Sequence, residues 1–176
     1  LENVSFAYNG EPAIEDVTLA IRPGDFIAMI GPNGGGKTTL LKLMLGLLKA
    51  DSGSIRIFGK PPQAVSYRIG YVPQDIHINQ SFPISSLDVV LMGKLKPGRG
   101  WSRHAKEDRM DALQALERVG VGKYSHHRIG ELSIGQKQRV FIARALVTDP
   151  DILFLDEPTA SIDTKGQNEF YAILKE

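Results

Sequence analysis

The spacing of hydrophobic and polar residues changes several times along the chain and predicts alternating strands and helices. An alternating run at Val4–Tyr8 predicts a strand that ends at the turn Asn9-Gly10. A second alternating run, Val17–Ile21, predicts another strand. The run Phe26–Ile30 is continuously apolar, which is typical of a strand buried on both faces. After an interruption rich in glycine, Thr38–Leu48 is expected to form a helix.

The same pattern continues to the end of the chain. Further strands are expected at Ser54–Phe58, Ile69–Val72 and Ile152–Leu155. Further helices are expected at Ser85–Met92, Arg103–Val119, Ile134–Val147 and Thr164–Lys175, with Ser133 as the N-cap of the third. In the second of them, Met110, Leu113 and Leu116 fall on one face and predict its buried side. Strands alternate with helices at both ends, while the middle, roughly Pro73–Leu132, contains no buried strand. The pattern therefore predicts an α/β fold with a mostly parallel central sheet and a helical insertion.

A glycine-rich segment between the expected strand Phe26–Ile30 and the following helix matches a phosphate-binding motif. Residues Gly31–Thr38 fit G-x-x-x-x-G-K-[ST] at every fixed position. Glycines permit the positive φ angles that turn backbone N–H groups inward, and the helix that follows directs its positive end at phosphates. Binding of the phosphates of Mg·ATP is expected from eight residues: Gly31, Asn33, Gly34, Gly35, Gly36, Lys37, Thr38 and Thr39. Lys37 would reach the β- and γ-phosphates, and the Thr38 hydroxyl would bind Mg²⁺, which prefers oxygen ligands.

A second chemical signal follows the last expected strand. Ile152–Leu155 is fully apolar and ends in Asp156-Glu157-Pro158. Acids in this position stand at the carboxyl edge of the sheet, where ligands of open α/β folds bind. Asp156 is expected to hold Mg²⁺ through water, and Glu157 to act as the general base that orients the attacking water.

Composition narrows the classes of function. The net charge of +1 gives no clustered basic excess of the kind that binds nucleic acid, so no nucleic-acid partner is expected. No apolar run is long enough to cross a bilayer, and the chain has no cysteine for disulfides or cysteine metal sites. The first residue is Leu1 rather than methionine, and Glu176 ends inside an expected helix. We therefore expect the sequence to be part of a longer polypeptide.

One further segment separates this chain from other phosphate-loop proteins. Leu132–Gln136 reads Leu-Ser-Ile-Gly-Gln and is followed by Lys137 and Arg139. It resembles the signature loop of ABC (ATP-binding cassette) ATPases, usually L-S-G-G-Q, and Ile134 departs from the usual glycine. The resemblance covers nearly the whole chain. It implies a P-loop NTPase core with a mostly parallel sheet, an N-terminal antiparallel β part and a helical insertion subdomain. It also implies one domain in three parts: 1–73, 74–132 and 133–176.

The resemblance implies roles for residues outside the two motifs. In this family two subunits pair head to tail, so that Ser133, Gly135 and Gln136 of one subunit would cap the ATP of the other. Tyr8 matches the aromatic residue that stacks on adenine, although an ordinary strand aromatic is an equal alternative. Gln74 matches the Q-loop glutamine that touches Mg²⁺ and the attacking water. Asp163 matches the D-loop aspartate at the dimer interface.

One residue of the family is missing from the sequence. The family carries a switch histidine after a further strand, beyond Asp163. The four histidines here are His77, His104, His126 and His127, and all of them precede Glu157. We therefore expect this 176-residue chain to bind ATP but to hydrolyse it poorly.

A narrower resemblance concerns the transported substrate. The strings Phe82–Ser85 and Leu87–Gly93 resemble those of ATPases from zinc and manganese importers, and related strings occur in iron–siderophore and cobalamin importers. The resemblance implies a peripheral protein on the cytoplasmic face of the membrane, contacting a permease through the Q-loop and the helical subdomain. An external substrate-binding protein would act indirectly. A non-transport ABC ATPase and a non-catalytic nucleotide sensor remain alternatives.

Overall fold

The computed structural model describes residues 1–74, 82–95 and 104–156. The chain divides into two compact units, Leu1–Ser66 and Tyr67–Glu176, and each is described by itself. The expected helix Thr164–Lys175 lies outside the described residues. The division of the chain into parts at residues 73 and 132 stays a prediction.

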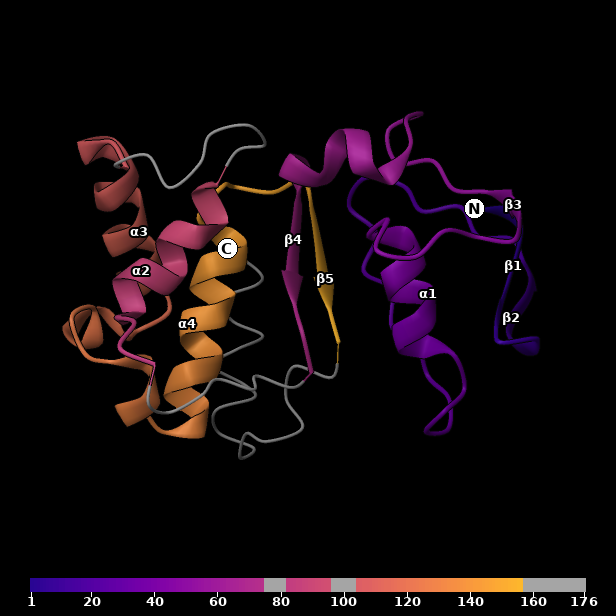
Figure 1. Ribbon diagram of the computed structural model, residues 1–176. Coiled ribbons are helices and arrows are strands. Elements are labelled where there is room, and N and C mark those ends of the chain that lie inside the picture. The colour runs from indigo at the N-terminus through magenta and orange to yellow at the C-terminus, as the bar shows by residue number, and fades with distance from the viewer. Residues whose placement is uncertain (75–81, 96–103, 157–176) are drawn as a thin grey trace. The chain divides into compact units, whose positions relative to one another are not determined.

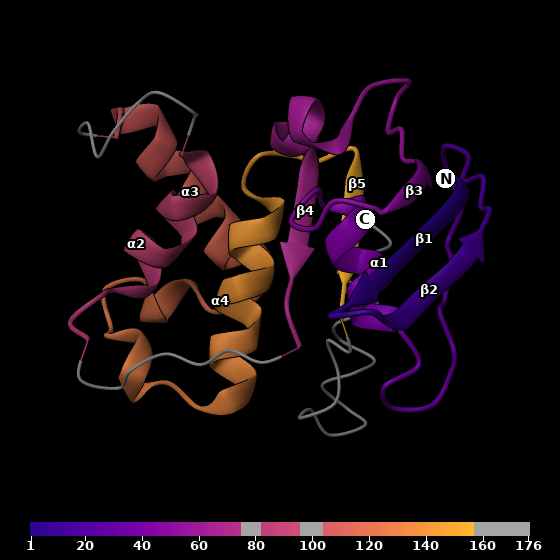
Figure 2. The ribbon, with the colours of Figure 1, turned by 45° about the vertical axis from the view of Figure 1, so that its right-hand side comes forward.

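The first unit is built on a β-hairpin. Strands β1 (Glu2–Tyr8) and β2 (Glu11–Val17) pair antiparallel, and the short strand β3 (Ser52–Ser54) pairs antiparallel with the other edge of β1. The hairpin turn consists of Asn9 and Gly10, with φ angles of 50° and 87°. Positive φ at both central residues is the geometry of the type I′ turn, which matches the twist of the paired strands. Figure 2 shows this hairpin with helix α1 beside it.

Helix α1 (Lys37–Met44) contributes to a small apolar core with the hairpin. Val4, Ile14 and Leu43 form its buried centre, and Leu40 and Ile55 are among the partly buried residues packed against it. This core holds the first turn of α1 at a defined position relative to β2, which matters for the phosphate motif.

Two expected strands of the first unit are shifted. Val17–Ile21 was expected as a strand, whereas β2 ends at Val17, because the turn at Asn9-Gly10 makes pairing begin at Glu11. Ser54–Phe58 was also expected as a strand, but β3 ends at Ser54.

The reason for the second shift is a tight turn at Phe58 and Gly59. Their φ angles are 51° and 74°, and they join the isolated bridge between Ile57 and Lys60. The chain reverses there instead of continuing as a strand.

The expected buried strand Phe26–Ile30 was wrong for this structure. The segment forms no strand, and Phe26 and Ile30 are 79% and 95% exposed. An apolar run becomes a strand only when neighbouring strands accept and donate its backbone hydrogen bonds. Among the described residues of the first unit, the only sheet is β2-β1-β3, and this segment is not part of it.

The second unit combines a parallel strand pair with a group of helices. Strands β4 (Ile69–Val72) and β5 (Ile152–Leu155) pair in parallel, with Ile69 opposite Ile152 and Val72 opposite Leu155. Helices α2 (Ser86–Leu91), α3 (Lys106–Arg118) and α4 (Ile134–Leu146) lie together on one side of this pair (Figure 1). Among the described residues between β4 and α4, the regular elements are all helices or 3₁₀ turns, as expected, apart from one isolated bridge between Ser85 and Arg128. Short 3₁₀ turns complete the unit: η1 (Pro62–Arg68, which begins in the first unit), η2 (Met92–Lys94), η3 (Gly122–Tyr124) and η4 (Ile129–Glu131).

The main core of the protein lies among these helices. It includes Leu87, Leu91, Leu116, Ile129 and Ile142, all at least 98% buried. The expected buried face of α3 was partly wrong, because Met110 and Leu113 are exposed while Ala112 and Leu116 are buried. In the part of the chain that the structure describes, no helix has the length and apolar character needed to span a membrane.

Candidate functional site

The phosphate motif Gly31–Thr38, called here the phosphate loop, forms an exposed turn that leads into α1. The N–H of Gly35 donates to the carbonyl of Pro32 at 3.1 Å, which closes a four-residue turn. Gly34, the third residue of that turn, has φ of 80°. This is the position at which a type II turn requires a left-handed residue, and glycine takes it without a steric penalty.

The first turn of α1 presents backbone N–H groups at the end of this loop. Gly36 is the N-cap, with φ of 80°, and no side chain caps the helix. The N–H groups of Lys37, Thr38 and Thr39 precede the first intrahelical hydrogen bond, which runs from Leu40 to Gly36 at 2.8 Å. No acidic residue occupies the first turn. Such a helix start attracts an anion, through its donors and through the helix dipole.

Lys37 lies folded over the loop. Its Nζ donates to the carbonyl oxygens of Gly31 and Pro32, both at 3.0 Å. The ammonium group is therefore held beside the turn, at the place where a phosphate bound to the helix start would need a positive charge.

Gly36 anchors the loop against the hairpin. A Cβ on this residue would stand 2.6 Å from the carbonyl oxygen of Ala13 and 2.9 Å from Cδ1 of Ile14. Both distances are shorter than normal contacts, so no other residue fits without displacement. The loop therefore packs directly on β2, which fixes the entry point of α1.

Tyr8, the expected adenine-stacking residue, ends β1 beside the hairpin turn. Its side chain is 43% exposed, and its ring meets that of Phe6 edge to face, with centroids 4.8 Å apart. The ring is thus partly exposed, and its stacking role stays a prediction.

In the second unit, the structure brings Gln74 and Asp156 to one edge. Because Val72 lies opposite Leu155 in a parallel pair, the residues that follow both strands emerge at the same carboxyl edge. The N–H of Asp156 donates to the carbonyl of Val72 at 3.0 Å and extends the ladder by one residue. Asp156 is only 4% exposed, whereas Gln74 is exposed. The carboxylate and amide oxygens gathered here are of the type that Mg²⁺ prefers.

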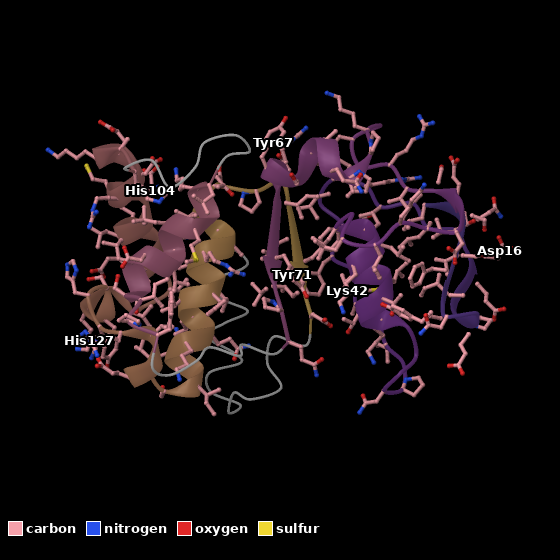
Figure 3. All side chains as sticks on the ribbon, in the orientation of Figure 1. Asp16, Lys42, Tyr67, Tyr71, His104 and His127 are labelled. Carbon is pink, nitrogen blue, oxygen red and sulfur yellow. The ribbon has the colours of Figure 1, made fainter. Side chains whose placement is uncertain are left out.

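Tyr71, which interacts with Asp156, and Arg144, which interacts with Tyr71, were not singled out in the sequence. Burial raises the pKa of Tyr71, the negative charge of Asp156 raises it further, and Arg144 opposes the increase. Burial lowers the pKa of Arg144, whose guanidinium stacks 4.5 Å above the ring of Phe141. Figure 3 labels Tyr71, on β4. No sequence motif indicates this pair, because Tyr71 on β4 and Arg144 on α4 are far apart in the chain and come together only in the folded protein.

The signature segment begins helix α4 as expected. Ser133 is its N-cap and forms a capping box: Ser133 Oγ accepts from the N–H of Gln136 at 3.3 Å, and the Ser133 N–H donates to Gln136 Oε1 at 2.9 Å. Ile134 is 66% exposed, and a Cβ on Gly135 would meet no atom within 4 Å. Within the described part of the chain, the start of the helix is therefore exposed.

The structure thus groups the predicted residues in three places. The phosphate loop and Tyr8 belong to the first unit, while Gln74 with Asp156, and Ser133 with Gly135 and Gln136, belong to the second. Glu157 and Asp163 lie outside the described residues. Across residues 1–74, 82–95 and 104–156, no cluster of three or more histidine, aspartate or glutamate side chains is arranged to hold a metal ion.

Comparison with known proteins places these motifs in context. The family profile described as "ABC transporter" matches residues 14–160. The manganese transport system ATP-binding protein MntB of Bacillus subtilis is 44% identical over 100% of this chain and 70% of its own length. The zinc transport system ATP-binding protein TroB of Treponema pallidum is 43% identical over 99% of this chain and 66% of its own length.

Solved structures give the same result for the fold. A nucleotide-free ATP-binding cassette from an ABC transporter has a TM-score of 0.85 and 28% identity, covering 99% of this chain and 74% of that one. A dimeric bacterial ABC transporter cassette has a TM-score of 0.84 and 31% identity, covering 99% of this chain and 80% of that one.

Proposed function

Because the chain belongs to the ABC transporter family, we propose that it is the ATP-hydrolysing subunit that powers import of zinc or manganese across the cytoplasmic membrane. The assignment of zinc or manganese as the substrate rests on sequence identity: the chain is 44% identical to a manganese transport protein and 43% identical to a zinc transport protein over essentially its whole length. The chain spans 70% and 66% of the lengths of these relatives, so the activity of the complete protein is part of the proposal. Import of an iron–siderophore or of cobalamin is the alternative within the same class.

The first step of the proposed activity is capture of ATP by the phosphate loop. The N–H groups of Lys37, Thr38 and Thr39 donate to phosphate oxygens, and Lys37 exchanges its two carbonyl partners for the β- and γ-phosphates. Gly31, Asn33, Gly34, Gly35 and Gly36 let the backbone approach the phosphates. Tyr8 stacks on the adenine ring. The donor set, the positive helix end and the absence of an acid in the first turn of α1 support this assignment.

The second step is hydrolysis, and the residues for it are proposed at the edge formed by β4 and β5. Mg²⁺, when bound, would neutralise negative charge that develops on the phosphates. Thr38, Gln74 and Asp156 would hold the ion through oxygen atoms, Asp156 through water. Glu157 would accept the proton of the attacking water, and Gln74 would position that water.

The third element is a second copy of the chain. Ser133, Gly135 and Gln136 would cap the γ-phosphate held by the partner, and Asp163 would stand at the interface. The exposed start of α4 supports this arrangement, because its N–H groups and the Ser133 hydroxyl, which are joined in the capping box, would form a second anion site when the partner's phosphate approaches. Ile134 narrows the space through which the partner's γ-phosphate would approach the start of α4, since it puts a branched side chain where the family usually has glycine.

The remaining partners follow from the class of transporter. Gln74 and the helical part of the second unit would contact a membrane permease, which would hold the protein at the cytoplasmic face of the membrane. A substrate-binding protein outside the membrane would select the metal ion. The 176-residue chain by itself would hydrolyse ATP poorly, because its four histidines all precede Glu157 and none can act as the switch histidine.

Two substitutions test the chemistry. Lys37→Ala should abolish ATP binding, measured by equilibrium titration with a fluorescent nucleotide. Glu157→Gln in the complete protein should preserve binding and trap a nucleotide-bound dimer, visible by size-exclusion chromatography. A normal rate of ATP hydrolysis in Glu157→Gln would exclude Glu157 as the general base. If the 176-residue chain hydrolysed ATP at the rate usual for the family, the proposal that it hydrolyses ATP poorly would be wrong.

The substrate needs a transport measurement. Cells that lack the gene should lose high-affinity uptake of radioactive zinc or manganese, and the wild-type gene should restore it while the gene encoding Lys37→Ala should not. Unchanged metal uptake together with lost uptake of a ferric siderophore or of cobalamin would replace the substrate while leaving the ATPase assignment intact.

A further inference from the structure

Asparagine followed by glycine occurs twice in the chain, at Asn9-Gly10 and at Asn33-Gly34, and the second pair lies inside the phosphate loop. Such a pair is chemically labile, because the glycine nitrogen can approach the side-chain carbonyl carbon of asparagine with no Cβ in the way. In a folded protein the reaction also requires solvent access and groups that are not held by hydrogen bonds.

The Asn33-Gly34 pair meets these requirements. Both residues are exposed, and a Cβ on Gly34 would have no atom within 4 Å. Among the described residues, neither the Asn33 side chain nor the Gly34 N–H takes part in a hydrogen bond. The segment that precedes the turn, 26–31, belongs to no strand or helix. One backbone hydrogen bond, from Gly35 to Pro32, closes the turn.

Two other asparagines of the first unit provide contrasts. Asn3 donates from Nδ2 to Asp16 Oδ1 at 2.8 Å, so its amide is held, and buried Val4 follows it. Asp16 is labelled in Figure 3. Asn9 is exposed like Asn33, but its turn is clamped by the paired strands at Tyr8 and Glu11. The backbone at Asn9 is therefore less free to reach the geometry of attack.

We propose that Asn33 is a site of spontaneous deamidation that inactivates the nucleotide site, and that bound nucleotide protects it. The Gly34 nitrogen attacks Asn33 Cγ, a C–N bond forms, and the Cγ–Nδ2 bond breaks. The amide proton leaves with the amine as ammonia. Water then opens the resulting succinimide at either carbonyl, which yields aspartate or isoaspartate. No oxidant, reductant or enzyme is required.

The products oppose the proposed function of the loop, on which this inference rests in part. Aspartate places a carboxylate among donors that would hold phosphates. At a separation of about 4 Å in water, like unit charges repel by about 1 kcal/mol, which corresponds to about a fivefold loss per phosphate charge and more at lower dielectric. Isoaspartate also inserts a carbon into the main chain, so the turn from Pro32 to Gly35 can no longer close in the same way.

Bound nucleotide should slow the reaction, because phosphate oxygens would engage the loop N–H groups and hold the turn. When the nucleotide is present at about 100 times its Kd, about one molecule in 100 is free, so the rate at Asn33 should fall by up to about a hundredfold. Asn9 lies outside the phosphate loop, in the turn between β1 and β2, so its rate should change much less than that of Asn33.

The experiment ages the purified protein at mildly alkaline pH and follows both asparagine peptides by mass spectrometry, with isoaspartate detected enzymatically. One sample contains Mg²⁺ with a non-hydrolysable ATP analogue, and a matched sample contains Mg²⁺ alone. Asn33 should convert faster than Asn9 without nucleotide, and nucleotide should protect Asn33 much more strongly than Asn9. Freshly prepared Asn33→Asp should bind ATP at least about tenfold more weakly than wild type, and Asn9→Asp, the control, should bind normally.

The outcomes separate this inference from the proposed function. An Asn33 that stays intact while Asn9 converts, or equal rates with and without nucleotide in a protein that binds ATP, would overturn the inference alone. If fresh wild-type protein fails to bind ATP, the proposed function fails, while the mass-spectrometric rate at Asn33 without nucleotide still decides whether the site is labile.

Discussion

Gly36 lies so close to β2 that a side chain at this position would disturb both the fold of the first unit and the phosphate loop. We predict that Gly36→Ala destabilises this unit clearly more than Gly10→Ala. Both glycines have strongly positive φ, 80° and 87°, so both substitutions incur the same left-handed strain of about 1–2 kcal/mol. They differ in their surroundings, because a Cβ on Gly10 would meet no atom within 4 Å.

The extra cost at Gly36 comes from contact with β2. Its Cβ would stand 2.6 Å from the carbonyl oxygen of Ala13 and 2.9 Å from Cδ1 of Ile14. Ala13 belongs to a paired strand, and Ile14 is buried in the core with Leu43, so neither can move freely. Overpacking of this kind costs about 1–3 kcal/mol, and we expect that difference in the free energy of unfolding between the two variants.

Urea unfolding followed by circular dichroism measures the difference. With m of about 1–3 kcal/mol/M, the midpoint for Gly36→Ala should lie below that of Gly10→Ala by at least a few tenths molar. Gly36→Ala should also weaken ATP binding, because α1 would start at a different position, whereas Gly10→Ala should not. Coincident midpoints at equal m would refute the reasoning, since they would mean that the loop does not pack on β2.

Three further predictions concern the second unit. Ser133→Ala removes the oxygen that accepts from the N–H of Gln136 and should lower the free energy of unfolding by about 1 kcal/mol. In a protein that already carries Gln136→Ala, which breaks the other half of the capping box, Ser133→Ala should cost less. Equal losses in the wild type and in Gln136→Ala would show that the two halves of the box are not coupled. Gly70→Ala would place a Cβ 2.7 Å from a backbone oxygen of α4 and should destabilise the unit by about 1–3 kcal/mol in urea titrations; a neutral result would mean that α4 and β4 are less closely packed. Arg68 donates to both oxygens of Asp151, at 2.6 and 2.9 Å, and lowers the pKa of that carboxyl below its ordinary value of 3.8. A lowered pKa in the folded state adds stability that is present above the ordinary pKa and is lost as the pH falls through the folded-state pKa. Asp151→Asn should therefore flatten the acid limb of a plot of unfolding free energy against pH. An unchanged acid limb would show that this exposed pair contributes nothing to stability.

Local chemical signals were sufficient for the motifs. The spacing of Gly31, Gly36 and Lys37 predicted a phosphate-binding turn that leads into a helix, and the structure has a turn followed by α1 at this place. Ser133 was identified as an N-cap from its position before an apolar periodic run, and its capping box confirms this. The apolar runs ending at Val72 and Leu155 were expected as strands of a mostly parallel sheet, and both form strands, which the structure pairs in parallel.

Interactions between distant parts of the chain decided what the motifs could not. Phe26–Ile30 has the composition of a buried strand but forms none, because a strand requires hydrogen-bonding neighbours that its own residues do not specify. The register of β2 follows from the turn at Asn9-Gly10, and it differs from the alternation at Val17–Ile21.

The same distinction applies at the proposed nucleotide site. The sequence by itself predicted which residues would bind phosphate or magnesium, since that prediction rests on side-chain chemistry and spacing. Only the tertiary structure showed that Gly36 must be glycine because Ala13 lies against it. It also showed that Asp156 is buried at the edge it shares with Gln74. Contacts between residues far apart in the chain depend on packing in three dimensions, which no local pattern encodes.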